Sequence, residues 1–513
     1  MKKKLLAFMA TCLLVSVVAF AQNASATPPD KPLSVAKSFK GFKPLNMTFG
    51  CSGQVALTAV KNMPSKRKAS GQEISRYVEA DYTYPESVRS ISAIVAYESS
   101  GENEGVLYNM WGYTDTLSIK TNITAGTVSV AATMIANDDT YGPIWICPID
   151  LQSRTFSTSS SIQGTISADG TVTLGSWGVF VVSGKYEGSS FGVYSKSVFM
   201  PANATISDLL KSPKAESGAD SIETFPACVR QVNDNEAELF NLGNVPSSVI
   251  LRLSSDSTVT ISPQYMLSNR YYGDFYCYPA NFSEGSGKVE GNITGKGNPE
   301  GIDLGNWGIF ARSGSSRYRI VKSSTIHFAN GTLNYPAPLA LDWTGQGTES
   351  LPYVITKPEQ LLALSESVAK GEDYQKKFIA LGANIDLSAV SRSFIPIGNK
   401  LHPFKGTFDG AGYTISNLNI HTGIENYQGL FGYADDSGVL KNIRLDSPNI
   451  TTQGKYAGFI CGETNGTVMG CVVTGAEAQF GNINSGGILG GLSDGESRLS
   501  FNSPWIENPI IQR

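Results

Sequence analysis

Residues 174–180 read LGSWGVF and residues 304–310 read LGNWGIF, so one strand-like segment occurs twice with an offset near 130 residues. Four further pairs of short segments keep nearly the same offset: Tyr108-Asn109 with Phe240-Asn241, 128–130 (VSV) with 259–261 (VTI), Tyr141-Gly142 with Tyr272-Gly273, and 164–166 (GTI) with 291–293 (GNI). A period of this length is too long for one turn of a solenoid. Residues 71–335 are therefore expected to contain two copies of a whole domain, repeat 1 at 71–208 and repeat 2 at 209–335.

Both copies carry short runs of β-branched and aromatic residues separated by turns that contain glycine. Asp169-Gly170 between Ile166 and Val172 predicts a hairpin, because glycine adopts the positive φ of a tight turn. We expect each copy to be a small antiparallel β-barrel or β-sandwich, and the sequence leaves these two open. Trp177 and Trp307 have apolar neighbours, which favours core positions over exposed platforms that stack on sugars.

A second, shorter period follows the prolines of a linker at 336–344. The segments 429–432 (GLFG), 458–460 (GFI) and 487–490 (GILG) begin 29 residues apart, and Val439 and Val468 keep that spacing. Short strands at a fixed period in the twenties indicate a parallel β-solenoid, with Asn and Gly at its tight corners.

One amphipathic helix is predicted at 359–369 (EQLLALSESVA), with Pro358 just before its start. Leu361, Leu362, Leu364 and Val368 lie on one side of that helix. A helix over the first turn of the solenoid would cover an open sheet edge.

Residues 404–410 (FKGTFDG) and 413–418 (YTISNL) resemble the opening coil of GLUG-motif β-helix domains, which occur in surface and secreted proteins of Bacteroidetes-type bacteria and beside IgA-protease-type peptidases. The motif itself is similar to 429–443 and 458–471. The segments that are similar to the family's entry segment are 352–355, 385–387 and 396–398. The resemblance implies an all-β chain that ends in a right-handed parallel β-helix (β-solenoid) at 345–513 with an N-terminal capping helix. It also implies a role in cell adhesion, and it transfers no catalytic residue.

The end of the chain departs from that pattern, because residues 498–513 show no glycine motif. We expect either a truncated solenoid or a cap in which Trp505, Ile506, Ile510 and Ile511 fold over the last coil.

The N-terminus predicts export. Three lysines precede an apolar stretch at 5–20, and Ala19-Phe20-Ala21 fits a signal-peptidase site, so residues 1–21 are expected to be a signal peptide cleaved near Ala21. An uncleaved anchor and lipidation at Cys12 are the alternatives; Cys12 lies inside the apolar run, which disfavours lipidation. The segment 22–70 has no clear period. The expected location is secreted or on the outer cell surface.

The six cysteines after the signal peptide are too sparse for a disulfide framework and contain no CxxC pair. Cys147 and Cys277 are assigned equivalent places in the two repeats, as small buried apolar residues. A Cys461–Cys471 bridge is left open.

The sequence offers little for catalysis. There are three histidines and no HExxH, no phosphate-binding loop, and no GxSxG elbow between a strand and a helix. A polysaccharide-cleaving β-helix would need paired carboxylates. The solenoid acids are Asp409, Asp435, Asp436 and Asp446, and Asp409 and Asp435-Asp436 stand beside Gly or Ser, where Asp completes turns. No catalytic, cofactor or metal residue is assigned.

A net charge of −4 provides no overall basic field for nucleic acid. The prediction is a secreted or surface-exposed, non-enzymatic binding protein, an adhesin for a glycan or a host or cell-surface protein, with membrane contact only through surface attachment. Its ligand-binding residues are not indicated. The alternatives are a structural stalk of the cell envelope and a β-helix polysaccharide-cleaving enzyme. Exposed aromatics on one face would favour glycan binding over a stalk, and paired buried carboxylates in a groove would favour an enzyme.

Overall fold

A computed structural model describes residues 74–84, 89–101, 103–108, 110, 116–211, 220–245, 247–269, 272–282, 287–298, 300–312, 316–329, 333–481, 484–492, 506–507 and 510–512. The expected signal peptide with Cys12 and Ala21, the segment 22–70 with Cys51, and Trp505 lie outside the described residues. The described part is all-β apart from one α-helix and two short 3-10 turns.

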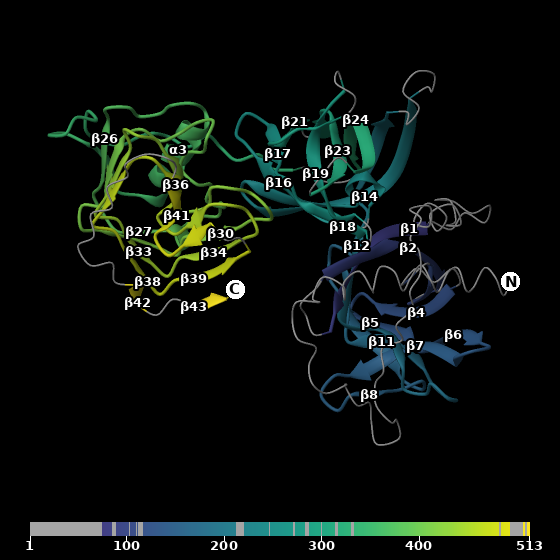
Figure 1. Ribbon diagram of the computed structural model, residues 1–513. Helices are drawn as coiled ribbons and strands as arrows, with labels where there is room; N and C mark the ends of the chain where they lie inside the picture. The colour runs from purple at the N-terminus through teal and green to yellow at the C-terminus, as the bar shows by residue number, and fades with distance from the viewer. Residues whose placement is uncertain are drawn as a thin grey trace.

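The first copy is a closed antiparallel barrel (Figure 1). Its strands, in the order of pairing, are β1 (Ile74–Thr83), β2 (Arg89–Gly101), β3 (Glu104–Tyr108), β4 (Thr116–Asn122), β5 (Thr127–Ala131), β9 (Ser161–Ile166), β10 (Val172–Leu174) and β12 (Ser190–Pro201). β12 pairs back onto β1, with Ala80 opposite Val198, which closes the ring. The closure decides for a barrel and against a sandwich. The predicted hairpin is confirmed, since Val172 pairs with Ile166 and Gly170 has a φ of 83°.

The long β12 also carries a lateral extension of the barrel sheet. β12 pairs with β11 (Trp177–Val181), β11 with β7 (Gly142–Asp150), and β7 with β6 (Thr133–Asp138) and β8 (Thr155–Phe156).

The second copy has the same strand order and closes through β13 and β24. Its ring comprises β13 (Ala204–Leu210), β14 (Ser221–Asn233), β15 (Glu236–Phe240), β16 (Ser248–Leu253), β17 (Thr258–Ile261), β21 (Ile293–Asn298), β22 (Gly301–Leu304) and β24 (Arg317–Phe328). Its extension comprises β23 (Trp307–Ala311), β19 (Gly273–Asn281), β18 (Tyr265–Asn269) and β20 (Gly287–Lys288). The 3-10 turn η2 (Leu242–Asn244) joins β15 to β16. The second sheet thus begins at Ala204, before the boundary at residue 209 expected from the sequence.

Strand register corrects two of the sequence equivalences. Trp177 pairs with Pro148 and Trp307 with Pro279, so Cys147 corresponds to Tyr278, and Cys277 corresponds to Ile146. The two cysteines therefore face opposite sides of their sheets, because a one-residue slip inverts every side chain. Likewise Gly164 faces Leu174 and Gly295 faces Leu304, so the partner of Gly164 is Gly295 and not Gly291.

The remaining strands form parallel sheets, to which successive turns of chain contribute one strand each. The first sheet contains β25 (Tyr353–Ile355), β26 (Phe378–Leu381), β28 (Thr407–Asp409), β32 (Val439–Lys441) and β37 (Thr467–Met469). The second contains β27 (Ile385–Asp386), β29 (Thr414–Ser416), β33 (Arg444–Asp446), β38 (Val472–Thr474) and β42 (Ile506–Glu507). The third contains β30 (Asn419–His421), β34 (Asn449–Thr452), β39 (Glu477–Phe480) and β43 (Ile510–Gln512). The last two contain β31 (Phe431–Ala434), β36 (Cys461–Thr464) and β41 (Leu489–Leu492), and β35 (Ala457–Gly458) with β40 (Ser485–Gly486).

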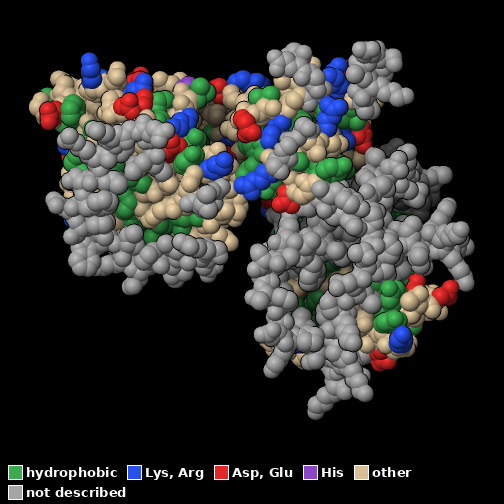
Figure 2. Space-filling view, in the orientation of Figure 1, with side chains coloured by type: hydrophobic (Ala, Val, Ile, Leu, Met, Phe, Trp, Pro, Cys, Tyr) green, Lys and Arg blue, Asp and Glu red, His purple; other side chains and the backbone are tan. Residues whose placement is uncertain are grey.

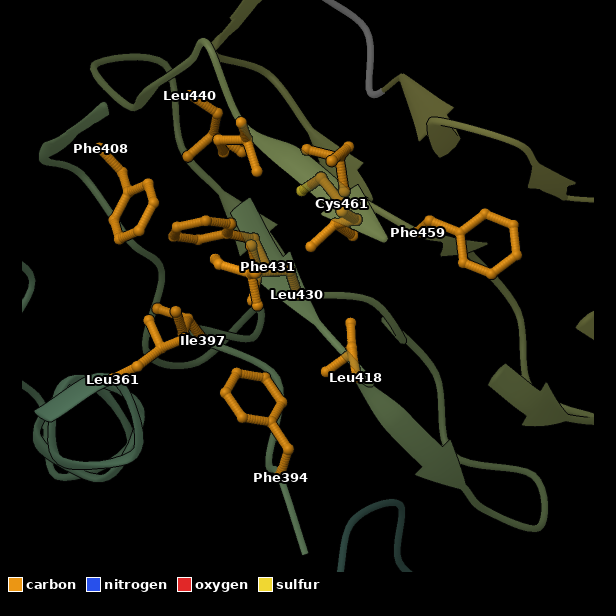
Figure 3. Packing of buried hydrophobic residues seen from close by; sticks show 14 of the residues in the cluster. Leu361, Phe394, Ile397, Phe408, Leu418, Leu430, Phe431, Leu440, Phe459 and Cys461 are labelled. Atoms are coloured by element: carbon orange, nitrogen blue, oxygen red, sulfur yellow. The ribbon is translucent and has the colours of Figure 1, made fainter. Parts of the chain in front are cut away.

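Apolar side chains from these sheets stack in a single core, where Phe431 lies between Phe408 and Cys461 (Figure 3). The helix α3 (Pro358–Ala369) adds Leu361 to the same core, and its predicted inward residues Leu362, Leu364 and Val368 are buried as well. The inward column of the first sheet is Ile379, Phe408, Leu440 and Val468. Val439 pairs with Thr467, so the assumed equivalence of Val439 and Val468 is wrong by one residue.

The corners follow the prediction in part. Asn417, Asn442, Gly470 and Gly475 have positive φ values between 55° and 63°, as expected for tight corners. The final segment does more than cap the stack, since Ile506 pairs with Val473 and Ile511 with Ala478 in continuation of two sheets.

Candidate functional site

The acidic residues that the sequence placed in the solenoid lie in the parallel-sheet region, where they stabilise turns and pair with neighbouring side chains. Asp409 accepts hydrogen bonds from the Ala411 backbone N–H and from the Asn442 amide at 2.9 and 3.0 Å, and it pairs with Lys441 at 3.2 Å. Asp435 accepts from the backbone N–H of Asp436. Asp446 accepts from the Thr474 hydroxyl at 2.8 Å. The turn interpretation is confirmed for Asp409 and Asp435.

The described cysteines are buried free thiols, and Cys461 and Cys471 are not bridged. Cys461 lies 0% exposed and its Sγ donates to the Glu463 carbonyl. No cluster of metal-ligating side chains occurs among the described residues. No described helix has the length and apolar character needed to cross a membrane.

The two repeated tryptophans are core residues, as predicted, and each is 0% exposed. In the second barrel Trp307 Nε1 donates to the Ser324 hydroxyl at 2.8 Å, and that hydroxyl donates to Asp208 at 2.6 Å. In the first barrel Trp177 donates to Ser197 at 2.7 Å, and Ser197 donates to Asp81. This buried Trp–Ser–Asp chain is structural, because none of its members reaches solvent.

A pair of stacked tyrosines marks a different kind of site. Tyr427 and Tyr456 occupy equivalent positions in successive turns, because Gln428 bridges to Ala457 in parallel register. Their rings lie 5.3 Å apart with an interplanar angle of 3°. Both side chains are half-buried. We call these two residues the tyrosine pair.

The tyrosine pair is held in an unfavourable backbone conformation. Both residues have φ = 63°, the left-handed region that bulky side chains rarely adopt. Elsewhere in the same stack such corners are occupied by Asn and Gly, and also by Tyr374, Lys376, Ala411 and Ser447. The left-handed region costs a residue with a Cβ roughly 1–2 kcal/mol, and residues retained there cluster at functional sites. The tyrosine pair is therefore the best candidate for a binding site.

Charged and polar groups surround the tyrosine pair. Lys400 Nζ lies 3.9 Å from the ring centroid of Tyr433, 6.0 Å from that of Tyr427, and 2.9 Å from Glu463 Oε1. Burial, together with the Glu463 carboxylate, raises the pKa of Tyr427. The phenol therefore stays protonated and able to donate a hydrogen bond. Beneath the pair, Gln428 is 4% exposed and its Oε1 accepts no hydrogen bond within the described structure.

The column of aromatic rings ends at Tyr456. Ala457 pairs with Ser485, so the next turn has Asn484 at the equivalent position. Among the described residues Tyr456 contacts no other ring than Tyr427. One ring face of Tyr456 is thus without an aromatic neighbour, and the residue at the equivalent position of the next turn is the polar Asn484.

The tyrosine pair lies beside the junction with the second barrel. Arg252 of β16 donates to both carboxylate oxygens of Glu425 at 3.0 and 2.9 Å, two residues before Tyr427. Arg312 donates to the carbonyl of Gln453 at 3.0 Å, three residues before Tyr456. Ile424 packs against the outer aromatic cluster of β19 and β23.

The sequence interpretation did not single out the tyrosine pair, although a signal was present. Tyr427 and Tyr456 each precede a motif glycine, Gly429 and Gly458, by two residues, so they share its 29-residue spacing. Their left-handed backbone was not visible in the sequence.

Comparisons with known proteins find similarity over part of this chain. Over 159 residues, 29% of this chain, it is 36% identical to halomucin of Haloquadratum walsbyi. Over 130 residues, 24% of this chain, it is 31% identical to a protein of Evansella cellulosilytica named "Putative Gly-rich membrane protein". The matched regions span 2% and 14% of those proteins. No family model and no solved structure matches.

Proposed function

We propose that this protein is an exported, non-enzymatic adhesin of the cell surface that binds glycans through the tyrosine pair. Under this proposal the parallel sheets form a right-handed GLUG-type β-solenoid. The ligand binds at the tyrosine pair of this solenoid, beside the second barrel. The strained, stacked conformation of Tyr427 and Tyr456 carries the proposal. A half-exposed ring beside hydrogen-bonding groups is the arrangement that sugar rings use for stacking.

The relatives support a location at the cell envelope. One of them is named a membrane protein and the name of the other refers to a mucin. The two differ from this chain over most of their length, so their names support the location and leave the ligand to be measured.

Tyr456→Asn separates a binding role from a structural one. Asn tolerates the left-handed region, so relief of roughly 1 kcal/mol of backbone strain offsets a similar loss of ring stacking. We expect the free energy of unfolding to change by less than about 1 kcal/mol, while binding on a glycan and extracellular-matrix array is lost. The measurement uses residues 22–513 of the chain, with urea unfolding alongside the array.

Tyr413→Asn is the matched control. Tyr413 is an exposed solenoid tyrosine, 37% accessible, outside the tyrosine pair. It should leave binding intact. Equal binding by wild type and Tyr456→Asn, to any ligand the array identifies, would refute the assignment of the site.

A structural stalk remains the second candidate, because the junction between the second barrel and the parallel sheets is extensively clamped. Asn235 and Ser393 exchange hydrogen bonds in both directions, and Ser393 also donates to Glu236 at 2.5 Å. A blank array with wild-type protein would favour this candidate.

A further inference from the structure

The junction beside the tyrosine pair carries cations without carboxylate partners. Arg312 and Lys455 are exposed, and no described carboxylate forms an ion pair with either. Glu425, an acid of the same junction, has both carboxylate oxygens engaged by Arg252. Arg312 and Lys455 are thus two exposed positive charges at the junction of a chain whose net charge is −4. Figure 2 shows Lys and Arg side chains gathered where the second barrel meets the parallel sheets.

The two cations converge on one short segment. Arg312 donates to the Gln453 carbonyl, and Lys455 follows Gln453 by two residues. Two residues of chain span at most about 7 Å, so the backbone of Lys455 lies close to the carbonyl that Arg312 contacts. Tyr456, whose half-buried ring stacks on Tyr427, is the next residue.

Neighbouring contacts hold Arg312 in place. Its guanidinium lies 5.9 Å from the ring centroid of Tyr276, and Lys288 Nζ donates to its backbone carbonyl at 3.2 Å. The Arg312 backbone N–H donates to the Asp274 carbonyl at 2.9 Å. A cation that is already oriented loses less conformational entropy when it binds an anion.

We infer that the ligand of the tyrosine pair is an acidic polysaccharide, whose carboxylate or sulfate group binds between Arg312 and Lys455 while a sugar ring stacks on Tyr456. The inference rests on the proposed glycan-binding function and adds the chemical class of the ligand. Arginine and lysine both favour such anions, and arginine can bind them bidentately.

The test measures binding of residues 22–513 to labelled oligogalacturonate, which carries carboxylates, to dextran sulfate, and to a neutral galactan oligosaccharide of the same length. The charge variant is Arg312→Gln with Lys455→Gln. Gln retains a donor for the Gln453 carbonyl, so the junction is preserved while both charges are lost. Lys120→Gln, on β4 of the first barrel, is the control, because Lys120 is exposed and its pairing with Glu104 at 3.7 Å is weak.

We expect one of the two anionic probes to bind, and the charge variant to lose about tenfold or more in affinity for it, since charge-assisted hydrogen bonds are among the strongest single contacts. Binding should weaken as salt is added. Which probe binds identifies the carboxylate or the sulfate as the anion.

Three outcomes would overturn the inference. If the neutral galactan binds as tightly, and only Tyr456→Asn weakens it, the glycan-binding function stands but the ligand is not acidic. If none of the three oligosaccharides binds, the acidic-ligand inference fails, and the array decides the proposed function separately. Vesicles of phosphatidylglycerol and phosphatidylcholine serve as a fourth probe, and if the protein binds them but none of the polysaccharides, the site recognises a membrane.

Discussion

At the residue scale, both barrels contain the buried Trp–Ser–Asp hydrogen-bond chain, but the residues around that chain differ. Asp208 is 0% exposed and forms a salt bridge with Arg319 at 2.8 Å. Arg319 forms a second salt bridge with Glu223, also at 2.8 Å. Burial raises the pKa of Asp208, against the opposing effect of Arg319. In the first barrel Gly192 occupies the place of Arg319, so this arginine has no counterpart at that position.

Ser324→Ala should destabilise the protein by about 1–3 kcal/mol, because it leaves the Trp307 N–H and one Asp208 oxygen buried without their shared partner. Ser323→Ala is the control, since Ser323 is the neighbouring residue of β24 and points to the opposite face. Urea unfolding followed by tryptophan fluorescence measures both. Equal effects of the two substitutions would mean that the hydrogen-bond chain contributes nothing to stability.

The buried thiols predict sensitivity to alkaline pH. Burial raises the pKa of Cys147, Cys228, Cys277 and Cys461 to about 12, and that of Cys471 to about 11. A thiol with a raised pKa in the folded state contributes stability below its unfolded pKa, near 9, and that contribution is lost as the pH rises towards 12. We expect the free energy of unfolding to fall between pH 9 and pH 11.

Thiol titration in a Cys51→Ser background measures the same burial directly. At pH 8 the five described cysteines of the native protein should not react with Ellman's reagent, and all should react in urea. Rapid reaction of Cys461 or Cys277 in the native state would contradict the burial on which the pH prediction depends.

At the element scale, glycines of the parallel sheets allow adjacent turns to approach. A Cβ on Gly462 would lie 2.6 Å from the Tyr456 carbonyl oxygen and 2.8 Å from that of Gly432, and both atoms are fixed backbone. Gly462→Ala should therefore cost about 2 kcal/mol or more and disturb the tyrosine pair. Gly287→Ala is the control, because a Cβ there meets nothing within 4 Å. Thermal unfolding compares them; a Gly462→Ala protein as stable as wild type would show that the turns can separate.

The sequence predicted the elements better than their register. The core helix, the Asp169-Gly170 hairpin and the Asn and Gly corners each follow from a local preference, and the structure confirms them. Closure of the barrel depends on β1 meeting β12, more than a hundred residues away, and no local pattern encodes that pairing. Cys147 was misaligned with Cys277 because the sequence offset between the repeats varies by a residue or more. Side chains alternate between the two faces of a strand, so an alignment error of one residue assigns a side chain to the wrong face. The backbone strain of Tyr427 opposes residue preference and could not be predicted from it.

At the scale of the whole molecule, the two junctions between modules differ in chemistry. The barrels meet through a small apolar cluster of Ala80, Met200, Cys228 and Phe240. The second barrel meets the parallel sheets through ions and hydrogen bonds, with Arg252 between Glu425 and Glu236. Directional contacts fix an orientation more strictly than an apolar cluster does. The second barrel and the parallel sheets should therefore move as one body, with the site between them preserved.

Arg252→Ala tests this rigid unit. The substitution leaves Glu425, 10% exposed, without its bidentate partner, and loss of one member of a buried ion pair costs about 3–5 kcal/mol. We expect limited proteolysis to cut within the linker at 336–344 faster than in wild type, and small-angle X-ray scattering to report a larger radius of gyration. Arg230→Ala is the control, because Arg230 pairs with Glu238 of the same barrel and not with a residue of the parallel sheets, and its side chain is 54% exposed. Unchanged scattering and proteolysis in Arg252→Ala would mean that the Asn235–Ser393 contacts hold the second barrel against the parallel sheets. Ser393→Ala combined with Arg252→Ala would then be needed to separate them.

If glycan binding falls in the variant whose second barrel has separated, while the tyrosine pair is intact, the ligand must contact both the second barrel and the parallel sheets.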